Sequence, residues 1–179
     1  MSESWKRFLR ISVVTFLVVT VVIVIFATWY KLTYSMDVAT AREINDPKLA
    51  TKVLIATQGS KFKNEVVNGI IGKLKDEPVY IKVADVSELA QVNKDDWSVI
   101  VVIHTWEMGV PPQVVSTFVS STNPSDLIIL TTSGDGHYHM QGVDGITSAS
   151  QTSDVDRCVR EILNRIEIKI APEEISNIR

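Results

Sequence analysis

The stretch KVLIATQGSKFKNEVVNGIIGKL, residues 52–74, decides the fold class of this 179-residue chain. Its first part, Val53 to Ala56, is continuously apolar, which is typical of a strand buried on both faces. A loop of hydroxyl, amide and glycine residues follows it. Lys61 to Leu74 then repeats apolar residues at i, i+4 and i+8, as one face of a helix does. A buried strand joined directly to an amphipathic helix indicates a β-α-β unit.

The same alternation continues toward the C-terminus. Further strands are predicted at 79–83, 98–103, 126–130 and, more weakly, 145–149. Helices are predicted after Pro111-Pro112 and after a cap at Ser153 or Asp154. We therefore predict an α/β domain over residues 52–170, followed by a tail over 171–179. Its doubly wound, five-stranded parallel sheet would have the strand order 2-1-3-4-5.

Toward the N-terminus, residues 11–30 read ISVVTFLVVTVVIVIFATWY, without an acid or base before the final Tyr. About twenty apolar residues suffice to cross a ~30 Å hydrocarbon core as a helix, the one structure that satisfies its own backbone hydrogen bonds there. Trp5 and Trp29 lie near its two ends, where aromatic residues meet the membrane surface. We predict one transmembrane helix at 11–30, in contact with membrane lipid.

The charges around this helix predict its orientation. Lys6, Arg7 and Arg10 precede it, and Lys31 is the only basic residue close behind it. By the positive-inside rule, residues 1–10 form a cytoplasmic tail of a single-pass membrane protein, and the domain is extracytoplasmic.

A cleaved signal peptide is the alternative, with Ala39-Thr40-Ala41 as its cleavage site. The apolar run exceeds the usual ~7–15 residues of such peptides, which favours an uncleaved signal anchor. Residues 31–51 are predicted to form a stalk, partly helical around Val38 to Ile44.

Composition excludes several classes of protein. The net charge is −3 and no basic stripe is present, so nucleic acid is not an expected partner. One cysteine, Cys158, excludes an internal disulfide framework and a multi-cysteine metal site. His104, His137 and His139 lack the carboxylate spacing that would favour a metal centre.

Doubly wound sheets bind ligands beyond the carboxyl ends of their strands, which directs attention to three loops. Thr57-Gln58-Gly59-Ser60-Lys61 offers hydroxyl and backbone donors for a phosphate at a helix N-terminus, with Lys61 or Lys63 adding charge. A tight turn with Ser60 as N-cap is the equal alternative. The second loop, 104–112, presents Trp106 as a flat face for a planar ligand. The third, 134–138, offers two glycines for close backbone approach and Tyr138 as a second flat face.

With these three loops the chain resembles the flavodoxin family over residues 52 to about 170. Flavodoxins hold the FMN phosphate in a hydroxyl-rich first loop, where Thr57 to Ser60 stand here. Thr105-Trp106-Glu107-Met108-Gly109 is similar to the family's Thr-Trp-x-x-Gly-like loop, and Gly134-Asp135-Gly136-His137-Tyr138 is similar to its Gly-Asp-x-x-Tyr loop.

The resemblance implies non-covalent FMN binding. The implied binding residues are Thr57, Gln58, Gly59, Ser60, Lys61, Thr105, Trp106, Gly109, Gly134, Asp135 and Tyr138. Two features depart from the family: Lys61-Phe62 replaces its Gly-Asn-Thr continuation, and the fourth helix is missing or very short.

A second resemblance concerns the fifth strand. Residues 144–150, DGITSAS, are similar to the Asp-x-x-Ser/Thr-Gly-Ala-Ser/Thr motif to which a flavin transferase attaches FMN in subunits of membrane redox pumps. This resemblance implies covalent attachment at Ser150, as the lesser alternative to non-covalent binding. Ser148 replaces the glycine of that motif.

The sequence thus predicts a membrane-tethered flavodoxin-like domain that binds FMN and transfers electrons to or from a redox protein partner. The alternative is a ligand-free flavodoxin-like scaffold that binds a protein or a small molecule at the same edge. The Trp106 and Tyr138 pair favours the electron carrier, and Lys61-Phe62 favours the scaffold.

Overall fold

The structure is a computed structural model that describes residues 2–34, 36–107, 109–140 and 142–176. The chain forms two compact units, Met1–Ser35 and Met36–Arg179. The first unit is a single helix, α1 (Glu3–Tyr34), whose segment Glu3–Trp29 is long and apolar enough to cross a membrane. Apolar side chains are exposed along this segment, Phe16 by 70% of its surface, as expected of a helix surrounded by lipid. A signal sequence near the N-terminus would meet the same criterion of length and apolar composition.

The second unit is built on one mixed sheet of six strands, in the order β1-β3-β2-β4-β5-β6. The strands are β1 (Arg42–Ile44), β2 (Thr51–Thr57), β3 (Val79–Asp85), β4 (Val99–Thr105), β5 (Leu127–Thr132) and β6 (Ile146–Ser148). From β3 to β6 each neighbouring pair is parallel, and β1 is antiparallel to β3 at the edge. The prediction of an α/β fold is confirmed. The prediction of a five-stranded parallel sheet holds in part, because the antiparallel β1 adds a sixth strand and makes the sheet mixed.

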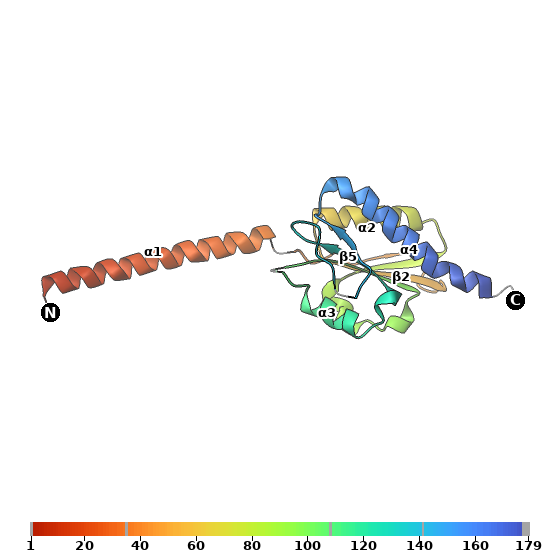
Figure 1. The fold of residues 1–179 in the computed structure, drawn as a ribbon, viewed down its shortest axis with the longest axis horizontal. Helices are drawn as coiled ribbons and strands as arrows, with labels where there is room; N and C mark the ends of the chain where they lie inside the picture. Colours follow the sequence, from red (N-terminus) through yellow and green to blue (C-terminus); the bar gives the residue numbers. More distant parts are fainter. Residues whose placement is uncertain (1, 35, 108, 141, 177–179) are drawn as a thin grey trace. The chain divides into compact units, whose positions relative to one another are not determined.

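Three longer helices cover the two faces of this sheet. In Figure 1, α2 (Lys61–Leu74) and α4 (Val155–Ser176) lie on one face and α3 (Gln113–Ser120) lies on the other. The strands explain these two layers, because successive side chains point to opposite faces. Val53 and Ile55 of β2 pack beneath α2 and α4, while Leu54 and Ala56 pack beneath α3.

Short 3-10 turns connect several of these elements: η1 (Val86–Gln91), η2 (Lys94–Asp96), η3 (Pro124–Asp126) and η4 (Thr152–Asp154). Between β5 and β6 the described residues, 133–140 and 142–145, contain no helix, as the sequence indicates. α4 runs through Ser176, so it includes most of the segment expected to be a tail; residues 177–179 lie outside the described residues.

The segment expected to be a partly helical stalk is the main difference from prediction. Arg42–Ile44, at the end of the expected helix, is the strand β1, in register with Ile81 to Val83 of β3. Earlier in the segment, Asp37 pairs with Gly59, and Ala39 is buried. Part of the expected stalk therefore belongs to the folded unit, because unpaired backbone groups of β3 and of the first loop bind it.

Candidate functional site

The three loops singled out from the sequence follow β2, β4 and β5 at the carboxyl edge of the sheet. Four of the five predicted residues of the first loop, Thr57 to Ser60, form hydrogen bonds within the protein. Thr57 ends β2, is 1% exposed and donates its hydroxyl to the Gln58 carbonyl at 3.1 Å. Ser60 is the N-cap of α2 and accepts from the Lys63 backbone N–H at 3.2 Å. Lys61 is exposed on the first turn of α2.

Gln58 joins the first loop to the second. Its Oε1 accepts from the backbone N–H of Thr105 at 2.7 Å, and its Nε2 donates to Glu107 at 3.4 Å. The side chain is 8% exposed, so both ends of the amide are satisfied inside the protein. Through its side-chain amide, Gln58 therefore links the loop after β2 to the end of β4 and to the loop that follows it.

Gly59 is paired with a segment that sequence analysis did not connect to the site. Its N–H donates to the Asp37 carbonyl at 2.6 Å, and its carbonyl accepts from the Asp37 N–H at 3.0 Å. We call Met36 to Ala39 the strap. It also reaches the end of β3, where the Ala39 N–H donates to Asp85 Oδ2 at 2.8 Å.

The most unusual group at this edge is the ammonium of Lys63, which is 1% exposed. Its Nζ lies 2.5 Å from Thr105 Oγ1 and 3.0 Å from the Met36 sulfur. Thr105 Oγ1 in turn lies 2.7 Å from Thr132 Oγ1, at the end of β5. The amine is thus the start of a buried polar chain that runs from α2 across the adjacent ends of β4 and β5.

Burial lowers the pKa of Lys63 to about 8, because the low-dielectric interior disfavours the charged form; the nearby Glu107 carboxylate opposes this effect. His104 lies in β4, not on the loop where the sequence placed it, and is fully buried. Burial lowers the pKa of His104 to about 4, so its imidazole is neutral at pH 7. Among the described residues, His, Cys, Asp and Glu form no group that would hold a metal ion.

The second and third loops meet through their aromatic rings. Trp106 and Tyr138 have ring centroids 5.0 Å apart and an angle of 32° between their planes. The Trp106 backbone N–H donates to the Thr132 carbonyl at 2.8 Å, which continues the pairing of β4 with β5 beyond Thr105. Gly109 turns the second loop with a φ of 79°, between the paired residues Glu107 and Val110.

The third loop is organised by its own carboxylate. Asp135 Oδ1 accepts from the His137 N–H at 3.2 Å and from the Ser133 hydroxyl at 2.8 Å, and these hydrogen bonds lower its pKa. Gly134 is exposed at the start of this turn. Gly136 has a φ of 74°, and a Cβ there would lie 2.7 Å from the Ala149 nitrogen. The third loop is therefore packed onto the segment that follows β6.

Ser150, the predicted attachment residue, lies in that segment. It is exposed, has a left-handed φ of 59°, and donates its N–H to Ser148 Oγ at 3.1 Å. The structure therefore brings residues of all three loops to one edge, with Ser150 after the neighbouring strand end.

The arrangement does not fit FMN as it stands. A phosphate at the first loop needs donors, but the Gly59 N–H is bound to the Asp37 carbonyl and the Lys63 backbone N–H is bound to the Ser60 hydroxyl oxygen. A planar ring between Trp106 and Tyr138 needs about twice the ~3.5 Å contact distance of carbon atoms, more than their 5.0 Å separation. Flavin binding therefore requires both the strap and the ring pair to move.

Lys63 contributes more contacts to the site than Lys61, which the flavodoxin resemblance implied; the loop itself left Lys61 and Lys63 as alternatives. A signal for it exists: Lys63 precedes Val66, Val67 and Ile70 by three, four and seven positions. That spacing places a charged residue on the buried stripe of α2, where an amine is expected only with polar partners. Met36 carries no such signal, because its contact with Lys63 joins residues 27 positions apart.

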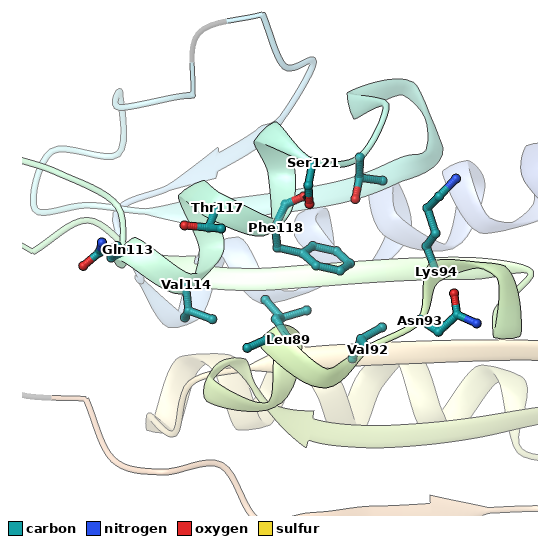
Figure 2. Close-up of a pocket in the computed structure, with 11 residues that line it drawn as sticks. Leu89, Val92, Asn93, Lys94, Gln113, Val114, Thr117, Phe118 and Ser121 are labelled. Carbon is teal, nitrogen blue, oxygen red and sulfur yellow. The ribbon is translucent and has the colours of Figure 1, made fainter.

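A hollow lies on the α3 face of the sheet. Figure 2 shows Leu89, Val92 and Phe118 gathered between α3 and η1, with Asn93 and Lys94 at one end. The groove has a volume of about 550 Å³, and none of the residues predicted for flavin binding lines it.

No protein-family model matches this chain, and no curated protein matches it either.

Proposed function

We propose that this protein is a membrane-tethered, flavodoxin-like binding module. Its ligand site lies at the carboxyl edge of β2, β4 and β5 and is closed by the strap. The order of its parallel strands, β3-β2-β4-β5-β6, supports the flavodoxin-like assignment, because β2, the first of them in the chain, lies between the second and third. The apolar segment Glu3–Trp29 supports the tether. Lys6, Arg7 and Arg10 support a cytoplasmic N-terminus and an extracytoplasmic domain.

The observation that carries this proposal is the pairing of Asp37 with Gly59. It uses the backbone donor that a flavodoxin-like phosphate loop would offer to FMN, at 2.6 Å. A domain whose first loop is bound to its own chain does not depend on a tightly held flavin. It instead presents a switch-point site to a protein or a small molecule.

The second candidate is electron transfer with non-covalent FMN and a redox protein partner. The contact of Trp106 with Tyr138 favours it, because two aromatic rings on facing loops are what a planar isoalloxazine would stack against. When bound, FMN would supply the redox chemistry. The chain's own part would be to separate these rings and to exclude water around them.

FMN titration of the full-length protein in detergent separates the two candidates. Under the binding-module proposal, flavin fluorescence shows no saturable quenching, and no yellow colour stays with the protein through gel filtration. Stoichiometric quenching that is lost in Trp106→Ala would overturn this proposal and establish the electron carrier.

Protein purified from membranes also tests the covalent alternative. Yellow colour that stays with acid-precipitated protein and is absent from Ser150→Ala would assign a flavin link to that hydroxyl.

A further inference from the structure

The strap crosses the ends of three adjacent strands. Ala39 binds the Asp85 carboxylate at the end of β3, and Asp37 forms two backbone hydrogen bonds with Gly59 after β2. The Met36 sulfur lies 3.0 Å from Lys63 Nζ and 3.5 Å from Thr105 Oγ1, at the end of β4. The strap therefore covers the switch point, where doubly wound sheets bind their ligands.

The amine of Lys63 lies under the strap, and the Met36 sulfur that covers it is a poor hydrogen-bond partner for it. A protonated lysine carries three hydrogen-bond donors, while a thioether is only a weak acceptor. The Thr105 hydroxyl supplies one good partner, and Met36 stands where a second would be. A negatively charged oxygen at the position of the Met36 sulfur would form a charge-assisted hydrogen bond with the same amine.

We propose that the strap is an intramolecular lid that competes with an anionic ligand for Lys63 and the Gly59 N–H. This inference rests on the proposed function and adds its regulation. In the closed state, Met36 and Asp37 occupy the two donors. In the open state, both donors face a phosphate or carboxylate group. The strap begins two residues after α1 ends, so the segment that closes the site is also the connection to the membrane helix.

Gly59 offers a way to remove the lid without touching Lys63. A Cβ at Gly59 would lie 2.7 Å from the Asp37 oxygen and 2.9 Å from two other Asp37 atoms. Its backbone is outside the left-handed region, so alanine is compatible with the local conformation. Gly59→Ala therefore pushes against the strap, whereas Gly72→Ala is a matched control with nothing within 4 Å of the added carbon.

The test uses the full-length protein in detergent and measures the lid directly. We expect amine-reactive acylation of Lys63, followed by mass spectrometry, to be at least tenfold faster in Gly59→Ala than in the native chain or in Gly72→Ala. Hydrogen exchange in peptides containing Met36 to Ala39 should rise in parallel. An unchanged Lys63 rate together with unchanged exchange of the strap would overturn the lid.

Inorganic phosphate tests the ligand class in the same samples. It should slow the acylation of Lys63 in Gly59→Ala, and chloride at equal ionic strength should not. Nanodiscs with and without phosphatidic acid then distinguish a soluble phosphate from a lipid headgroup. An open lid whose Lys63 ignores both phosphate and the anionic lipid would overturn the anion part of the proposal.

A second variant keeps the test decisive if Gly59→Ala fails to fold. Met36→Ala removes the sulfur beside Lys63 and leaves the backbone pairing of Asp37 intact. It should raise the acylation rate several-fold, while Val38→Ala, at a side chain that is 80% exposed, should not. None of these measurements uses flavin. Failure of the lid is therefore separate from the outcome of the FMN titration.

Discussion

At the scale of single residues, the buried amine of Lys63 dominates the physical chemistry of this domain. Its folded pKa of about 8 is below the ordinary 10.5, because burial disfavours the charged form. Glu107 partly offsets this cost, and His104, the other titratable neighbour, is neutral at pH 7. Below pH 8 the folded protein carries the full cost of the buried charge. Stability then rises with pH up to 10.5, since the folded state loses its proton first.

Replacing this amine should therefore stabilise the protein in a pH-dependent manner. We expect Lys63→Met to raise the free energy of unfolding by ~2 kcal/mol at pH 7. The gain should shrink as the pH passes from 8 toward 10.5. Denaturant unfolding at several pH values, followed by circular dichroism, measures it. A gain that is equal at pH 7 and pH 10 would show that packing, and not the charge, is responsible.

At the scale of elements, the contact between α2 and α4 depends on a missing side chain. Gly69 lies on α2, and a Cβ there would come within 2.7 Å of Val159 Cγ2 on α4. The branched side chain of Val159 is stiff at χ1 and cannot easily turn away. Gly72 is three residues further along α2 and faces open space. The two glycines share a helix and differ in what faces them.

We expect substitution by alanine to have opposite effects on the free energy of unfolding at these two glycines. Gly69→Ala should lower the free energy of unfolding by about 1–2 kcal/mol, because α4 must shift. Gly72→Ala should raise it by about 0.5 kcal/mol, because alanine has the higher helix propensity. Thermal unfolding of both variants checks the pair. A stabilised Gly69→Ala would mean that the helices separate at little cost.

The strands also show which elements the sequence pattern predicts and which it does not. The predictions of β2, β4 and β5 rested on continuous apolar runs, and these strands are confirmed. β1, with the sequence Arg-Glu-Ile, is too short for a period of two to stand out, and it exists because it pairs with β3. Such pairing joins distant positions, which propensity does not encode.

At the scale of the whole molecule, α1 and the domain differ in what surrounds them. The domain has its own two-sided core, with clusters on both faces of the sheet. Within its own unit, α1 exposes the apolar side chains of its described residues. We infer that the domain's folding does not depend on the helix.

Truncation tests this separation. A chain that begins at Met36 should stay in the supernatant after ultracentrifugation and should unfold cooperatively. The full-length protein should instead sediment with membranes after carbonate washing. Aggregation of the Met36 chain would contradict independent folding of the domain.

A second truncation tests the strap. A chain that begins at Arg42 lacks the strap and should unfold at a lower temperature than the chain that begins at Met36.

The sequence by itself determined the α/β class, the apolar N-terminal helix and the three loops that meet at the carboxyl edge. These features follow from local periodicity and from the rule that parallel strands end on one side. Only the tertiary structure decided that Met36 to Ala39 occupies that edge and that Lys63, not Lys61, is its buried cation. The physical reason is that these contacts satisfy backbone and ammonium groups whose partners are remote in the chain. The spacing of Lys63 indicates that it is buried, but no local pattern records which residues bind it.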